Sequence, residues 1–140
     1  MTKRDRNYLI VFLSITLLFV AYMFIKNTGA KAYQIIQHHT YNEDTLTEGQ
    51  YNGSFEAYNI KFAEVDFYLD SGKVKKFKIH TLIHAPWINV KASIIDTITK
   101  KDTLDFDAIS GATGTSLYVK AAIRDAIKNA ESDTSITPKK

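Results

Sequence analysis

Hydrophobic and polar positions follow a different spacing in each part of the chain, and the first part is a continuous apolar run. Tyr8–Ile25 reads YLIVFLSITLLFVAYMFI, eighteen residues without a charged side chain. At about 1.5 Å per helical residue the run spans roughly 27 Å, close to the hydrocarbon thickness of a bilayer. Only a helix satisfies its own backbone polar groups there, so the run predicts a transmembrane helix.

Alternating positions dominate the middle of the chain. The segments 61–70 and 74–83 place apolar or β-branched side chains at every second position. Period-two alternation predicts half-buried strands. Asp-Ser-Gly-Lys lies between them and makes Gly72 available for a positive φ, so the two segments predict an antiparallel hairpin. The preceding stretch, 49–60, carries Gly and Asn turn signals.

Helical spacing takes over in the last third of the chain. Apolar side chains recur every three or four positions over 90–98, which predicts a helix that starts near Pro86. A short strand is predicted over Thr103–Ile109. A second helix is predicted over Ser116–Ala130, with a buried stripe made of Val119, Ile123, Ala126, Ile127 and Ala130.

These elements predict the fold class and the division of the chain. The order strands, helix, strand, helix indicates an α+β fold: an N-terminal transmembrane helix followed by a small antiparallel sheet packed with helices. The expected parts are a cytoplasmic tail (1–7), a transmembrane helix (8–25), a juxtamembrane linker or helix extension (26–47), a folded domain (48–130) and a flexible tail (131–140).

The basic residues around the apolar run suggest its orientation. Lys3, Arg4 and Arg6 precede the run, while Lys26 and Lys31 follow it. This small excess predicts a cytoplasmic N-terminus, with the folded domain outside the cytoplasm. The alternative is a cleaved signal peptide, for which TGAKA at 28–32 is a passable cleavage site, although such apolar regions are normally shorter.

Composition narrows the classes of partner. The chain has no cysteine, which fits an exported domain that relies on its core and excludes a lipid-modified cysteine as anchor. The net charge is only +3, and no basic stripe interleaved with aromatic residues is present, so we expect no nucleic-acid partner. Neither the adjacent His38 and His39 nor the pair His80 and His84 has the spacing of a metal site on its predicted element, so we expect no metal.

The candidate chemistry lies in DAISGATGTSLY, Asp107–Tyr118, directly before the second predicted helix. The first N–H groups of a helix lack intrahelical partners and carry partial positive charge, so they attract phosphate. Glycines allow a ligand to approach the backbone, and hydroxyl groups can bond phosphate oxygens or be esterified. The alternative is an ordinary N-cap, for which a single hydroxyl is enough. The loop lacks the lysine of a P-loop and the Gly-x-Ser-x-Gly pattern of serine hydrolases.

The stretch Asp107-Ala-Ile-Ser-Gly-Ala-Thr113 resembles the flavinylation motif Asp-x-x-Ser/Thr-Gly-Ala-Thr of the FMN-binding domain family. That family includes the flavin-carrying C subunit of sodium-pumping NADH:quinone reductase and the G subunit of Rnf complexes. The likeness extends over 48–130, through EGQYNGSFEAYNIKFAEVDFYLDSGKVKKFKI and IIDTITKKDTLDFDAISGATGTS. The chain is shorter than those subunits and resembles a minimal, single-span version of the module.

The resemblance implies a covalent cofactor. A separate flavin transferase would join the phosphate of FMN to Thr113 as a phosphoester, with Asp107 as part of the transferase recognition element. Ser110, Gly111 and Ala112 would shape the loop. From their positions, Thr115 and Ser116 are expected to bond phosphate oxygens.

Two further residues are candidates for contact with the flavin ring. Trp87 offers an aromatic surface for stacking, and its alternative is an ordinary half-buried tryptophan beside Pro86. His84 could bond the ring or the phosphate, and its alternative is a loop histidine that faces water.

Together these features predict a membrane-anchored, extracytoplasmic electron-transfer protein that carries FMN on Thr113. No general acid–base pair or nucleophile is visible, so we expect a carrier without substrate turnover of its own. Its expected partners are the flavin transferase, membrane redox proteins and the lipid bilayer. The alternatives are a non-covalent flavin-binding or sensory module, and a structural accessory subunit of a membrane redox complex.

Overall fold

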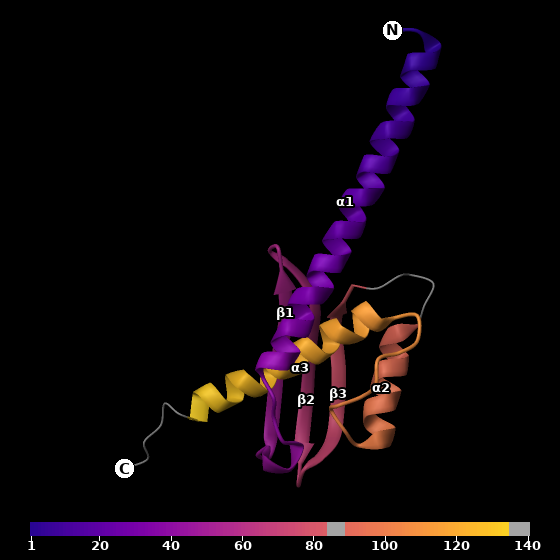
Figure 1. Cartoon of the computed structure of the whole chain (residues 1–140). Coiled ribbons are helices and arrows are strands. Elements are labelled where there is room, and N and C mark those ends of the chain that lie inside the picture. Colours follow the sequence, from indigo (N-terminus) through magenta and orange to yellow (C-terminus); the bar gives the residue numbers. More distant parts are fainter. Residues whose placement is uncertain (84–88, 135–140) are drawn as a thin grey trace.

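The α+β architecture expected from the sequence is confirmed by a computed structural model, which describes residues 1–83 and 89–134 (Figure 1). Its elements in chain order are α1 (Lys3–His38), the short 3-10 helix η1 (Glu43–Thr45), β1 (Gly49–Ala57), β2 (Ile60–Asp70), β3 (Lys73–Leu82), α2 (Val90–Lys101) and α3 (Thr113–Thr134). Long α1 projects from one end of the domain, and α3 crosses the sheet obliquely.

The described strands form one antiparallel sheet in the order β1-β2-β3. Tyr51, Phe67 and Phe77 stand opposite one another in neighbouring strands. Each hairpin closes through two residues with positive φ, the geometry of a type I′ turn. In the β2–β3 turn these are Ser71 and Gly72, at 53° and 76°, and the predicted hairpin is confirmed there.

The apolar face of the sheet packs against α2 and α3. The alternating side chains of β2 are buried, and so is most of the predicted stripe of α3; the fully buried members include Phe67, Val65, Val119 and Ile123. Helix α3 lies directly on β1 at Gly53. A Cβ at that position would lie 2.3 Å from the carbonyl oxygen of Ala122, so only glycine permits this approach. The stretch 49–57, which carries glycine and asparagine turn signals, forms strand β1 and pairs with β2.

Helix α1 runs without a break through the predicted membrane span and the predicted juxtamembrane stretch as far as His38. Its most apolar window has a mean hydropathy of 2.5 and no buried residue, so among the described elements α1 is the one helix long and apolar enough to cross a membrane. Beyond that window Thr28 and Ala32 are completely buried. The first half of the expected linker is therefore helix that packs on the domain.

The predicted short strand at 103–109 is wrong. Leu104 and Phe106 are buried as the alternation suggested, but this segment has no strand structure. One carboxylate oxygen of Glu43 accepts the N–H groups of Leu104 and Asp105, at 3.0 and 2.9 Å, and also the Thr103 hydroxyl at 2.9 Å. The backbone donors that would bond a neighbouring strand are thus used by a side chain from η1.

The helix boundaries also differ from prediction. α2 begins at Val90 after Asn89, and the expected start at Pro86 lies outside the described residues. α3 begins at Thr113, three positions before the predicted Ser116. At the far end of α2, Asp102 adopts φ 53°, and its carboxylate accepts the N–H of Val74 at 2.6 Å, which ties α2 to β3.

Candidate functional site

The hydroxyl-rich loop forms a tight turn directly before α3. The N–H of Ala112 donates to the carbonyl oxygen of Ile109 at 2.9 Å, which closes a four-residue turn. Gly111 occupies the third position of that turn with φ 78°, a conformation typical of glycine in a type II turn. Ser110 and Gly111, the two central residues of the turn, are exposed.

Ser116 braces this turn from inside. Its hydroxyl donates to the carbonyl oxygen of Ala112 and accepts the N–H of Ile109, both at 3.0 Å. The residue is fully buried. The structure does not support the expected contact of Ser116 with a phosphate oxygen. The hydroxyl proton and one acceptor position of the oxygen are already used in hydrogen bonds within the loop. Ser116 acts on the site by holding the shape of the turn.

Thr113 stands at the open start of α3 and is exposed. The first helical bond of α3 runs from the N–H of Ser116 to the carbonyl oxygen of Ala112, at 2.9 Å. The N–H groups of Thr113, Gly114 and Thr115 therefore belong to the unpaired start of the helix, where the dipole is equivalent to roughly half a positive charge. A phosphate ester on the Thr113 oxygen would carry its negative charge at this end.

The surroundings leave room for a phosphate. A Cβ built on Gly111 meets no described atom within 4 Å. A Cβ built on Gly114 meets only the hydroxyl oxygen of Tyr118 at 3.9 Å among the described atoms. The small residues thus border open space beside Thr113, and the residues present fit a phosphorylated cofactor.

Two lysine contacts surround the loop. Lys101 Nζ lies 3.8 Å from a carboxylate oxygen of Asp107, whose side chain is 99% exposed. Lys120 Nζ pairs with Asp105 at 3.0 Å and lies over the ring of Phe106. The Asp107 carboxylate is therefore fully accessible from solvent.

The predicted site residues separate into three groups. Asp107, Ser110, Gly111 and Thr113 lie together on the exposed surface of the turn, with Thr115 half-buried beside them. Ala112 and Ser116 are buried beneath it. The ring-contact candidates His84 and Trp87 lie outside the described residues.

Tyr118 is a neighbour of the site that sequence reasoning missed. Its ring packs against those of Phe55 and Phe62, with centroids 5.5 and 5.2 Å away, and these two rings also contact each other. Burial raises the pKa of the Tyr118 hydroxyl. Tyr118 follows Gly114 by one helical turn, on the side of α3 that faces the sheet. This placement could have been predicted from helical spacing alone. No such local signal marks Glu43, which holds segment 103–105 from sixty residues away.

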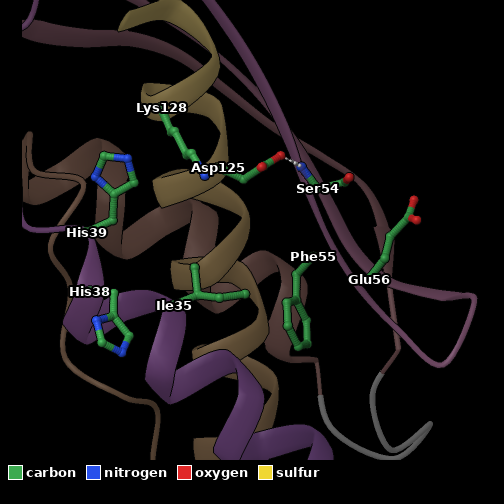
Figure 2. A pocket seen from close by; sticks show the side chains of 8 residues that line it. All are labelled: Ile35, His38, His39, Ser54, Phe55, Glu56, Asp125 and Lys128. Carbon is green, nitrogen blue, oxygen red and sulfur yellow. Dashed lines mark hydrogen bonds between the residues drawn. The ribbon is translucent and has the colours of Figure 1, made fainter. Parts of the chain in front are cut away.

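A separate hollow of about 640 Å³ lies where α1, β1 and α3 meet (Figure 2). Ile35, His38 and His39 line it from the side of α1, and Asp125 of α3 accepts the N–H of Ser54 at its edge, at 3.0 Å. Asp125 is twelve residues along α3 from Thr113, about 18 Å at the rise of an α-helix. The hollow is therefore distinct from the turn.

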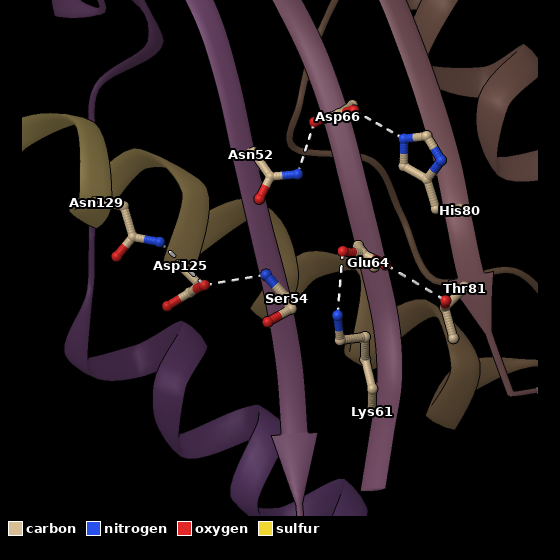
Figure 3. Close-up of polar contacts among 9 residues, drawn as sticks. All are labelled: Asn52, Ser54, Lys61, Glu64, Asp66, His80, Thr81, Asp125 and Asn129. Atoms are coloured by element: carbon tan, nitrogen blue, oxygen red, sulfur yellow. Dashed lines mark hydrogen bonds and ion pairs between the residues drawn. The ribbon is translucent and has the colours of Figure 1, made fainter.

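The face of the sheet away from α3 is polar (Figure 3). Asp66 accepts the amide of Asn52 and pairs with His80 Nε2, both at 2.7 Å, so these two contacts link side chains of all three strands. The Asn52 amide is the main reason that the pKa of Asp66 is lowered. Cross-strand pairs of this kind support a solvated sheet face and contribute little energy each. In the described part of the chain, no three His, Asp or Glu side chains converge as metal ligands would.

Comparison with known protein families covers the segment that contains the turn. Residues 35–128 match the family model of the FMN-binding domain, a segment that runs from the last turn of α1 through most of α3. No curated protein matches the sequence. The matched segment is two thirds of the chain and contains the turn at Thr113, so the chain belongs to the FMN-binding domain family.

Proposed function

We propose that this protein is a membrane-anchored electron carrier that holds FMN as a phosphodiester on the Thr113 oxygen, with its domain outside the cytoplasm. The observation that carries the proposal is the exposed Thr113 at the unpaired start of α3, in a member of the FMN-binding domain family. A hydroxyl buried like that of Ser116 would be out of reach of a modifying enzyme.

The linkage requires a second protein and an activated donor. In the transfer, a bond forms between the Thr113 oxygen and the phosphorus of a flavin nucleotide that carries a phosphoanhydride. The anhydride bond breaks and its other half leaves as a nucleotide. The hydroxyl proton passes to a base of the transferase, since the described part of the loop offers only the exposed carboxylate of Asp107, which lies near Lys101.

The chain's own residues hold and orient the attached group. The free N–H groups of the first turn of α3 stabilise the ester's negative charge. Ser116 and Gly111 keep the turn in the shape that exposes Thr113. When bound, FMN supplies one- and two-electron transfer, and covalent attachment prevents its loss from an exported domain.

The position of the turn supports exchange of electrons with a partner in the membrane. Phe24 lies near the end of the apolar run of α1, and its ring centroid is 6.2 Å from that of Phe62. Phe62 in turn lies 5.2 Å from Tyr118 in the first turns of α3. Two ring contacts thus separate the end of the apolar run from the helix that begins at Thr113.

The linkage is tested by co-expression of the full chain with a flavin transferase. We expect the intact mass to rise by one FMN less one water, and the band to fluoresce in a denaturing gel. Thr113→Val, which removes the hydroxyl at nearly constant volume, should abolish both signals, and Thr115→Val should retain them. A dark wild-type band beside an active transferase contradicts the linkage, and fluorescence lost on denaturation indicates non-covalent binding instead.

The orientation is tested separately. The chain has no cysteine, so Ser71→Cys in the exposed β2–β3 turn creates a unique thiol. A membrane-impermeant maleimide should label it in intact cells. Labelling only after the membrane is opened would place the domain in the cytoplasm.

A further inference from the structure

The β1–β2 turn lies level with the end of the apolar run of α1. Phe24 is the second-last residue of that run, and its ring centroid is 5.0 Å from that of Tyr58 in the turn. Phe24 also contacts Phe62 of β2. Since Phe24 lies where the apolar run ends, a bilayer spanned by α1 would have its surface beside this turn (Figure 1).

The exposed side chains of the turn are of the kind found at membrane surfaces. Tyr58 and Ile60 are 47% and 43% exposed, with the exposed Asn59 between them. Lys31 of α1 holds its Nζ 3.9 Å from the centre of the Tyr58 ring. Tyrosine collects at the headgroup level of bilayers, and lysine extends its charge toward lipid phosphates from an apolar stem.

The backbone conformation of the turn indicates that Tyr58 occupies this position because of its side chain. Tyr58 and Asn59 have φ of 53° and 60°. Type I′ turns favour glycine, asparagine or aspartate at these positions, and a bulky residue with positive φ is uncommon. The matching turn at the other end of β2 uses the small pair Ser71 and Gly72. Strain of this kind is a pointer to function when an exposed side chain accompanies it.

We propose that Tyr58–Ile60, here called the β1–β2 tip, inserts into the headgroup region of the bilayer that α1 spans, with Lys31 beside lipid phosphates. The domain then has two attachments to one membrane, the uninterrupted α1 and the tip. This holds the start of α3 at a set height above the surface. The inference depends on membrane insertion of α1 and is independent of the flavin linkage.

The test compares the two turns in the full chain. Single cysteines at Asn59 and Ser71 are spin-labelled, and the protein is reconstituted in vesicles of phosphatidylcholine and phosphatidylglycerol. The eleven residues of β2 separate the turns by about 35 Å. Accessibility to oxygen, which concentrates in lipid, is compared with accessibility to a water-soluble nickel chelate.

We expect the Asn59 label to favour oxygen and the Ser71 label to favour the chelate. Because Asn59 has positive φ, Ile60→Cys in the extended strand β2 repeats the measurement without disturbing the turn. Equal chelate accessibility at residues 60 and 71 overturns the proposal. Shielding of residue 60 from both reagents also overturns it, since it indicates contact with a second copy. Failure of the full chain to float with the vesicles removes its premise and contradicts it as well.

Discussion

Thr113 and Ser116 stand three residues apart in the first turn of α3, yet one is exposed and the other is completely buried. The motif presents both as hydroxyl residues of one loop. The fold assigns Ser116 to the inside of the turn, where it bonds Ile109 and Ala112, and leaves Thr113 at the surface. The division separates a residue that shapes the site from the one that the proposed chemistry uses.

Replacing Ser116 with alanine should therefore destabilise the domain whether or not flavin is attached. The variant leaves the N–H of Ile109 without its bonded oxygen in a part-buried position, which we expect to cost about 1 kcal/mol. Thermal denaturation of the full chain in detergent measures the loss. Thr115→Ala, a half-buried hydroxyl in the same turn, is the matched control and should melt near wild type. Equal melting temperatures of the two variants would show that the hydrogen bonds of Ser116 do not contribute to stability.

Glu43 should stabilise the approach to the site from a distance. Glu43→Ala removes the acceptor of three donors on segment 103–105, which we expect to lower stability by about 2 kcal/mol, since bonds to a charged acceptor contribute more than neutral ones. Amide exchange at Leu104 and Asp105 should accelerate. The exposed Glu48, which bonds the Tyr68 hydroxyl at 3.0 Å, provides the control as Glu48→Ala. Unchanged exchange at Leu104 would contradict the role of Glu43.

Gly53 should accept no side chain. In Gly53→Ala the new methyl group would lie 2.3 Å from backbone atoms of Ala122 and Ala126. Unlike a side chain, these backbone atoms cannot change rotamer to relieve the clash. Overpacking of this kind typically costs about 1–3 kcal/mol or more, and here it separates α3 from β1. Gly29→Ala in α1 meets no described atom within 4 Å and should be neutral or slightly stabilising. Two variants of equal stability would mean that α3 does not rest on Gly53.

Alkaline pH should destabilise the domain through Tyr41. Burial is the main cause that raises the pKa of the Tyr41 hydroxyl, against the opposing charge of Arg124, which lies 4.1 Å from the ring centre. The folded state thus keeps the proton at pH values where the unfolded chain, with a pKa of about 10, has lost it. The stabilisation is present below about pH 10 and falls above it, by up to about 1.4 kcal/mol per pH unit.

The measurement is the free energy of unfolding between pH 8 and 11, with Tyr41→Phe as the variant. We expect a shallower decline in the variant, and not a flat line, because the pKa of the Tyr118 hydroxyl is raised too. A wild-type stability that does not change over this interval would show that Tyr41 ionises equally in both states.

Some of these features could be predicted because their cause is local. A sheet with one wet face imposes period two on β2 and β3, and a bilayer imposes a long uncharged run. Local reasoning noted turn signals at 49–57 without assigning an element, and it wrongly took the alternation of Leu104 and Phe106 for a strand. Segment 49–57 is a strand that pairs with β2, and its Gly53 allows α3 to approach; segment 103–109 is not a strand, and Glu43 takes two of its backbone donors.

The sequence by itself determined that this chain has a helix long and apolar enough to span a membrane, a hairpin, and a small-residue motif before a helix, since each depends on side chains within a few positions of one another. Only the tertiary structure decided which hydroxyl of the motif faces solvent, that α1 continues into the domain, and that Tyr58 lies beside Phe24. Burial and long-range contacts set these outcomes, and they arise from segments that meet only after the chain has folded.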